Sequence, residues 1–262
     1  MKTRLDAELV RRGLARSREA ATDLIAAGNV LVSGMPASKA ATQVDAETSI
    51  TLKDDHAEFV SRGGHKLAGA LDKFTQIDVS GKTALDAGAS TGGFTDVLLK
   101  RGAKKVVAVD VGYGQLAWEL QKDERVKILD RVNVRNLTPA QVGEEIDLVV
   151  ADLSFISLKL VLPALISVAK EGADFLVMVK PQFEVGKEKL GAGGVVRDVH
   201  LRKEAVVAVA DSAFALTLGT LGVVASPLPG PSGNVEYFLW LRKGAPALLE
   251  VDLDLAIEKG PA

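Results

Sequence analysis

The stretch that decides the fold runs from Thr83 to Thr95 and reads Thr-Ala-Leu-Asp-Ala-Gly-Ala-Ser-Thr-Gly-Gly-Phe-Thr. Its apolar start predicts a buried strand that ends at Asp86. Its glycine-rich middle predicts a tight turn, and its end predicts a helix that begins near Phe94. The glycine spacing differs from Gly-x-Gly-x-x-Gly, and the Lys of a Walker loop is absent. Both facts disfavour a pyrophosphate site and an NTPase site.

Short apolar runs alternate with helical patterns on either side of this turn. The runs lie at 106–110, 126–129, 148–151 and 176–179, and the helical patterns lie at 95–101, 115–123 and 158–169. Continuous apolar strands that alternate with helices indicate a parallel sheet covered on both faces. Toward the end of the chain, two apolar runs at 222–225 and 235–241 predict a closing hairpin.

The beginning of the chain has a different pattern and predicts a small module of its own. Leu5 and Leu9 mark a first short helix, Ser17 lies at the N-cap position of a second, and Val30 and Val32 alternate as a strand. A polar stretch at 53–58 indicates a connection between domains. We predict a first domain at 1–56, a linker at 57–60, a second domain at 61–244 and a C-terminal tail at 245–262.

Composition excludes several classes of site. The chain has no cysteine, which rules out disulfides, thiolate zinc sites and cysteine nucleophiles. The histidines, His56, His65 and His200, are scattered, so we expect no metal site. A net charge of −2 excludes a uniformly basic nucleic-acid binder but allows a local basic patch.

The hydropathy pattern predicts neither a signal peptide nor a membrane-spanning segment. Acidic residues follow the initial Met where a signal peptide would need an apolar run. The most apolar later stretch, Ala205 to Ala225, is interrupted by Asp211 and Ser212, and we predict a core helix followed by a strand there. We therefore expect a cytoplasmic protein that does not contact membranes.

The glycine turn and the next strand end together predict a nucleoside cofactor. Asp110 ends the second strand, 22 residues after Gly88 (110 − 88), where an acid can accept both hydroxyls of a ribose. Asp130 ends the third strand and could reach the nucleobase. S-adenosylmethionine fits best, although a bare turn beside an unrelated surface acid would give the same pattern. The expected cofactor residues are Asp86, Gly88, Ser90, Thr91, Gly92, Gly93, Phe94, Asp110, Asp130 and Asp152.

Four further charged residues form a candidate catalytic set. Asp152 and Lys180 end two apolar strands, and ligands bind at the carboxyl ends of strands in open α/β sheets. Glu236 stands near the start of a hydrophobic strand, and Lys66 follows the linker. Each alone has an ordinary structural explanation, such as a solvated strand end or an edge charge that blocks aggregation. Together, two ammonium groups and two carboxylates at one end of a sheet indicate a catalytic site more strongly than any one of them does alone.

At these residues the chain resembles a known family. Lys66, Asp152, Lys180 and Glu236 match the Lys-Asp-Lys-Glu order of the FtsJ-like ribose 2′-O-methyltransferases, and the first sixty residues resemble the RNA-binding module of ribosomal protein S4. The combination is similar to the TlyA family, whose members are sometimes labelled hemolysins. The resemblance implies a Rossmann-like α/β methyltransferase with a mostly parallel seven-stranded sheet, preceded by a small α+β RNA-binding domain.

The same resemblance implies a function. Family members transfer a methyl group from S-adenosylmethionine to cytidine riboses in small- or large-subunit rRNA, within ribosomal subunits. We expect RNA contacts from five basic residues: Arg4, Arg18, Lys39, Arg62 and Arg135. Two alternatives are a non-catalytic RNA-binding or ribosome-assembly factor and a membrane-active hemolysin. The sequence leaves the oligomeric state open, with a monomer favoured.

Overall fold

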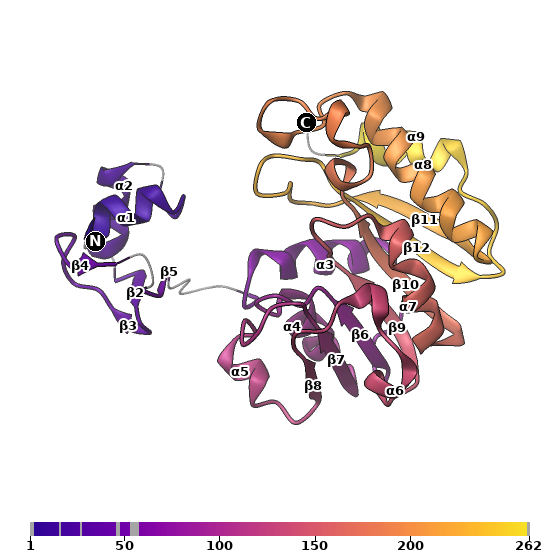
Figure 1. The fold of residues 1–262 in the computed structure, drawn as a ribbon, viewed down its shortest axis with the longest axis horizontal. Coiled ribbons are helices and arrows are strands. Elements are labelled where there is room, and N and C mark those ends of the chain that lie inside the picture. The colour runs from indigo at the N-terminus through magenta and orange to yellow at the C-terminus, as the bar shows by residue number, and fades with distance from the viewer. Residues whose placement is uncertain (1–2, 16, 27, 46–47, 53–57, 261–262) are drawn as a thin grey trace. The chain divides into compact units, whose positions relative to one another are not determined.

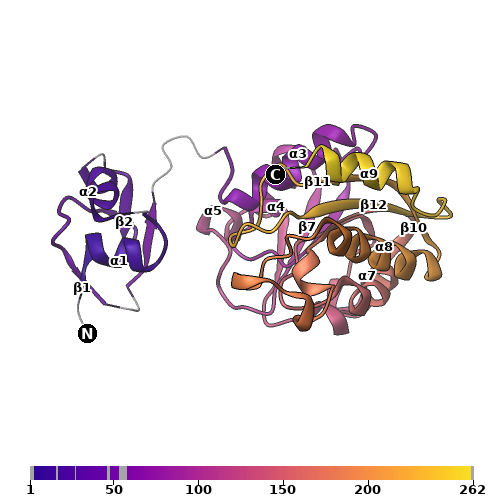
Figure 2. The same cartoon turned by 90° about the horizontal axis from the view of Figure 1, so that it is seen from above.

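The computed structural model describes residues 3–15, 17–26, 28–45, 48–52 and 58–260. The chain divides into two compact units, residues 1–58 and 59–262. Most of the polar stretch that we interpreted as a connection, residues 53–57, lies outside the described residues. Figures 1 and 2 show the elements of each unit in two views.

The first unit is a small α+β module, as the sequence predicted. Its elements are β1 (Thr3–Arg4), α1 (Leu5–Arg11), α2 (Arg18–Ala26), β2 (Val30–Val32), β3 (Met35–Pro36), β4 (Gln43–Val44) and β5 (Ile50–Leu52). The Ser17 hydroxyl accepts a hydrogen bond from the Ala20 amide at 3.1 Å, which is the predicted N-cap. Leu5 and Leu9 pack with Ile25 in a core of their own.

The second unit contains one seven-stranded sheet. Its strands are β6 (Thr83–Ala87), β7 (Lys105–Val109), β8 (Val126–Leu129), β9 (Ile146–Ala151), β10 (Ala169–Val179), β11 (Leu218–Ala225) and β12 (Tyr237–Lys243). Their order is β11-β12-β10-β9-β6-β7-β8. Only β12 runs antiparallel to its two neighbours, and β11 and β12 form the predicted closing hairpin. The mostly parallel seven-stranded sheet is confirmed.

Helices cover both faces of this sheet (Figure 2). The helices are α3 (Arg62–Lys73), α4 (Gly93–Lys100), α5 (Trp118–Gln121), α6 (Pro139–Val142), α7 (Leu162–Val168), α8 (Val199–Ala215) and α9 (Glu250–Glu258). Strand β9 divides its side chains between two cores: Val149 and Ala151 pack with α7 and α8, whereas Leu148 and Val150 pack with α3 and α4. A strand buried on both faces has the continuous apolar sequence that predicted it.

The second unit extends beyond the predicted boundaries at both ends. The predicted C-terminal tail is wrong in part, because α9 packs against edge strand β11 and buries Leu253 and Ala256 in the core. At the other end, Phe59 belongs to the core although we placed it in the linker, and its ring contacts His65 at 5.1 Å between centroids. The sequence did not predict α9 because few of its side chains are buried, so its apolar residues show little helical periodicity. Its role is to cover an edge strand.

No helix in the described part of the chain is both long enough and apolar enough to span a bilayer. The apolar stretch from Ala205 to Ala225 instead forms most of α8 and all of β11. This is the helix followed by a strand that the sequence predicted.

Candidate active site

The turn between β6 and α4 is held by close packing of its glycines. Gly88 and Gly92 have φ angles of 87° and 99°, a region that favours glycine. A Cβ on Gly88 would lie 2.6 Å from the carbonyl oxygen of Asp152, and one on Gly92 would lie 2.3 Å from Leu120. The Asp152 amide also donates to the Ala87 carbonyl at 3.0 Å. The glycine turn and the carboxyl end of β9 therefore hold each other in place.

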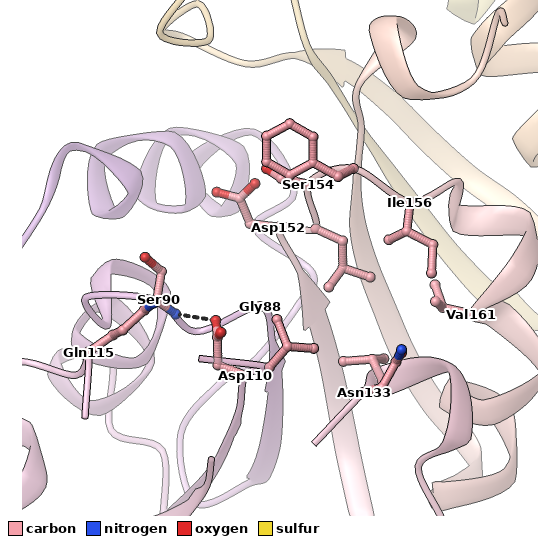
Figure 3. A pocket seen from close by; sticks show the side chains of 13 residues that line it. Gly88, Ser90, Asp110, Gln115, Asn133, Asp152, Ser154, Ile156 and Val161 are labelled. Carbon is pink, nitrogen blue, oxygen red and sulfur yellow. Dashed lines mark hydrogen bonds between the residues drawn. The ribbon is translucent and has the colours of Figure 1, made fainter. Parts of the chain in front are cut away.

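A cavity of about 490 Å³ lies beside this turn (Figure 3). Among the predicted cofactor residues, Gly88, Ser90, Asp110 and Asp152 line it. The Asp110 carboxylate accepts hydrogen bonds from the Ser90 amide at 2.9 Å and the Gly112 amide at 2.7 Å. These two bonds fix the carboxylate at the cavity wall, where its remaining lone pairs can accept ribose hydroxyls. The volume falls within the roughly 300–1,000 Å³ of small-molecule sites, so the residues fit a nucleoside cofactor.

Not all predicted cofactor residues reach this cavity. Asp130 is absent from its lining, and its carboxylate instead accepts a hydrogen bond from the Gly114 amide at 2.9 Å. Asn133, three residues further on, lines the cavity in its place. Sequence reasoning missed Asn133 because it lies after β8, in a loop whose path the strand pattern does not define.

Asp86 lies behind the glycine turn and is fully buried. The Thr95 hydroxyl donates to one of its carboxylate oxygens at 2.7 Å, and the other oxygen has no hydrogen-bond partner. Burial, helped by the negative charges of Asp152 and Asp110 and opposed by the hydrogen bonds from Thr95, raises the pKa of Asp86 to about 7. Asp86 therefore links the end of β6 to α4 through Thr95.

The two residues at the ends of β9 and β10 form an ion pair. The Lys180 ammonium lies 2.6 Å from a carboxylate oxygen of Asp152, and it also donates to the Ser154 hydroxyl at 2.9 Å. The Lys180 side chain is only 10% exposed. Parallel pairing of β9 with β10 places Val177 opposite Ala151, so that both strands end at the same edge of the sheet.

The other two residues form a second, more deeply buried pair. The Lys66 ammonium donates to Glu236 at 2.6 Å, and the side chains are 9% and 1% exposed. The second Glu236 oxygen is buried without a partner, and a Cβ on Gly230 would approach it to 2.6 Å. A glycine at 230 is therefore required if the turn before β12 is to close over this carboxylate.

Lys66 reaches the site because two helix starts pack backbone against backbone. A Cβ on Gly93, at the start of α4, would lie 2.7 Å from the Gly64 amide nitrogen of α3. A Cβ on Gly64 would in turn lie 2.4 Å from Phe59. The Arg-Gly-Gly-His-Lys sequence at 62–66 therefore has a structural reason: its glycines bring α3 close enough for Lys66 to contact Glu236.

A second cavity, of about 300 Å³, connects the two lysine–carboxylate pairs with the first cavity. Lys66, Asp152 and Lys180 line it, and Glu236 is bound to Lys66. Four residues line both cavities: Gly88, Ser90, Asp152 and Ser154. The four charged residues predicted from the sequence are thus brought together, next to the pocket formed after Asp86. Thr91, Gly93 and Phe94 also line this second cavity rather than the larger one.

Phe155 is a feature of the site that sequence reasoning missed. Its side chain is 92% exposed, it lines the larger cavity, and its backbone has a φ of 64°, which is rare for a bulky residue. Its ring packs against Phe183 with 5.2 Å between centroids. An exposed aromatic in a strained conformation at a cavity mouth is typical of a functional site.

The predicted RNA-binding residues lie on both units. In the first unit, Arg4 and Arg18 both pair with the buried carboxylate of Asp6, at 3.0 and 2.8 Å, and Lys39 is exposed. The hydrogen bond from Arg4, aided by the one from Arg18, holds the pKa of Asp6 far below its usual range although burial opposes the shift. In the second unit, Arg62 lines the smaller cavity and Arg135 is exposed.

A mostly parallel seven-stranded sheet, with a cavity and two lysine–carboxylate pairs at the carboxyl ends of its strands, is compatible with a methyltransferase. Family models agree: residues 59–243 match the FtsJ-like methyltransferase model and residues 3–50 match the S4 domain model. The chain therefore belongs to the FtsJ-like methyltransferases and, among them, to the TlyA family.

Individual relatives cover nearly the whole chain. It is 58% identical over 266 residues to the 16S/23S rRNA (cytidine-2′-O)-methyltransferase TlyA of Mycobacterium tuberculosis, with 99% of each chain covered. It is 37% identical to Hemolysin A of Brachyspira hyodysenteriae, with 89% of this chain and 97% of the relative covered. A solved structure from Streptococcus thermophilus, 36% identical, matches 98% of this chain and 95% of its own with a TM-score of 0.81.

The buried Asp86 carboxyl predicts a pH dependence of stability. Because its folded pKa, about 7, is higher than the ordinary value of 3.8, Asp86 contributes stability below pH 4 that is lost as the pH rises through 7. We expect Asp86→Asn to lose less stability than the wild type between pH 5 and pH 8 in urea unfolding experiments. Equal losses in the two proteins would contradict a raised pKa at Asp86.

Proposed function

We propose that this enzyme uses S-adenosylmethionine to methylate the 2′-oxygen of cytidine riboses in the rRNA of small or large ribosomal subunits, or of both. The observation that carries the proposal is the cavity lined by Lys66, Asp152 and Lys180, which shares four residues with the cofactor cavity. The substrate named for the Mycobacterium tuberculosis relative and the match to the S4 domain model support an rRNA substrate.

The reaction joins a ribose 2′-oxygen to a methyl carbon. S-adenosylmethionine, when bound, would supply an electrophilic methyl group on its sulfonium sulfur, and S-adenosylhomocysteine would be the leaving group. A ribose hydroxyl is a weak nucleophile until its proton is removed. In this proposal the Lys180 ammonium first releases a proton to solvent, and its neutral Nζ then accepts the proton of the ribose hydroxyl. General-base assistance of this kind typically contributes about 10²–10⁴-fold.

The other charged residues orient the reacting groups. Asp152 holds the Lys180 side chain through the 2.6 Å contact and lies where both cavities meet, so its charge can also face the positive sulfonium. Lys66, which lines the same cavity and is held by Glu236, orients the ribose hydroxyl. Alignment of the two reactants is the larger effect, because positioning can contribute roughly 7–11 kcal/mol.

Phe155 gives the site a means of holding a nucleobase. Its exposed ring stands at the mouth of the larger cavity, and base–aromatic stacking contributes about 1–3 kcal/mol per base. Phe155 does not line the second cavity, but its neighbour Ser154 lines both cavities, so an unstacked nucleotide held on the ring lies next to the cavity that would receive its ribose.

The first unit supplies the initial RNA contacts. Asp6 orients Arg4 and Arg18 while leaving guanidinium N–H groups available to phosphate oxygens, and Lys39 adds a further cation. We further propose that the protein acts on ribosomal subunits in the cytoplasm as a monomer, and the rRNA named as substrate of the Mycobacterium tuberculosis relative supports the ribosomal target. The intact set of four charged residues disfavours a purely non-catalytic assembly factor.

Lys180→Ala is expected to abolish measurable methyl transfer while leaving cofactor affinity within about threefold of the wild type, because it removes the proton acceptor but not the cofactor cavity. The measurement is transfer of radiolabelled methyl groups from S-adenosylmethionine to purified ribosomal subunits, with calorimetric titration of the cofactor. Lys170→Ala is the matched control, since Lys170 lies at the other end of β10 and pairs with Asp147. Near-normal transfer by Lys180→Ala would reject the proposed role.

Arg4→Ala and Arg18→Ala are each expected to weaken RNA binding and to reduce the salt dependence of the affinity. Each lost phosphate contact lowers the slope of log K against log salt concentration by about one. The measurement is binding of the full chain to ribosomal subunits or rRNA fragments across a salt series. Arg125→Ala is the control, because Arg125 pairs with its near neighbour Asp123 in the second unit. Unchanged slopes in both variants would place the RNA contacts elsewhere.

A further inference from the structure

The loops that leave β9 and β10 are joined at three successive points. The first is the catalytic pair of Asp152 and Lys180. The second is the contact between the Phe155 and Phe183 rings. The third is a set of hydrogen bonds from the stretch around Ser157 to Glu184. The first two points involve groups already placed in the site, whereas the third involves groups without an assigned role.

Glu184 accepts two hydrogen bonds from the opposite loop. One carboxylate oxygen accepts from the Ser157 hydroxyl at 2.6 Å, and the other accepts from the Leu158 amide at 2.7 Å. Ser157 itself accepts from the Lys159 amide at 3.3 Å, at the start of the short 3₁₀ helix η2 (Leu158–Leu160). Glu184 thus satisfies an amide at a helix start and fixes the serine that caps it.

These bonds cost Glu184 part of its contact with water. Burial raises its pKa, although the hydrogen bonds from Ser157 and Leu158 oppose the rise. A carboxylate that loses solvent to bind a neighbouring loop is expected where the position of that loop matters. Glu184 lines neither cavity, so it does not contact a cofactor or ribose bound there.

The contact restrains both members of the catalytic pair. Glu184 follows Lys180 by four residues, with the 3₁₀ helix η3 (Pro181–Phe183) between them, and Ser157 follows Asp152 by five. Between Asp152 and Ser157 the chain passes through the left-handed conformation of Phe155, which a bulky residue adopts only under restraint. Release at Glu184 would allow this loop to relax and to move relative to Lys180.

We propose that Glu184 is a positioning residue for methyl transfer, which holds the loop of Asp152 and Phe155 in register with Lys180. The proposal rests on the function proposed above, because it assigns Glu184 to the same reaction. A misplacement of about 1 Å can lower a rate by about 10²-fold, so loss of this contact should affect the chemical step more than binding.

Glu184→Ala tests the proposal through separate measurements of rate and binding. In single-turnover methyl transfer to purified ribosomal subunits at saturating substrate, we expect the rate constant to fall by about 10- to 100-fold. The dissociation constant for S-adenosylmethionine should stay within about threefold of the wild type. The matched control is Glu188→Ala, which removes an exposed glutamate from the same loop and should leave both quantities unchanged.

Glu184→Gln keeps the proposal testable if the alanine variant fails to fold. Its amide oxygen can still accept from Leu158, but its amide nitrogen cannot accept from the Ser157 hydroxyl. We therefore expect a rate between those of the wild type and Glu184→Ala. A rate within threefold of the wild type in Glu184→Ala, or a rate loss matched by an equal loss of cofactor affinity, would overturn the proposal.

Hydrogen exchange separates this proposal from the proposed function. The Leu158 amide should exchange faster in Glu184→Ala than in the wild type, whether or not ribosomal subunits are methylated. If the wild type fails to methylate subunits, the proposed function fails. If hydrogen exchange of the Leu158 amide is unchanged by the substitution, the proposal that Glu184 restrains this loop fails.

Discussion

The site depends on one interaction, the ion pair between Lys180 and Asp152. Parallel pairing of β9 with β10 brings the two strand ends together, and the surrounding apolar strands exclude water from one side of the pair. Removing one partner of a largely buried ion pair leaves an uncompensated charge. The pair therefore joins the two loops that follow β9 and β10, and it contains the group that we propose as the proton acceptor.

The rest of the site is arranged around this pair by close backbone packing. Gly88 lets the glycine turn between β6 and α4 contact the carbonyl of Asp152. Gly93 lets α4 approach α3, which carries Lys66. Gly230 lets the final turn close over Glu236. At each of these glycines a side chain would meet backbone atoms or a carboxylate that is part of the site. The larger cavity and the second cavity adjoin because the segments that contain these glycines pack directly against each other or against the charged residues of the site.

Strand ends were predictable from the sequence, whereas contacts between loops were not. Asp152 and Lys180 follow continuous apolar runs, so their placement at one sheet edge follows from the parallel fold. The grouping with Lys66 and Glu236 came from a resemblance to a family. Asn133, Phe155 and the α9 helix were missed because loop paths and edge coverage depend on long-range packing that leaves little periodicity in the sequence.

In the proposed reaction the methyl group is added to a ribose oxygen and not to a base. The most direct test is to incubate purified ribosomal subunits with the enzyme and S-adenosylmethionine, digest the rRNA to nucleosides and analyse them by mass spectrometry. The account predicts a gain of 2′-O-methylcytidine, in which the added mass remains with the sugar fragment. A gain of cytidine methylated on the base, or of no methylated nucleoside, would contradict it.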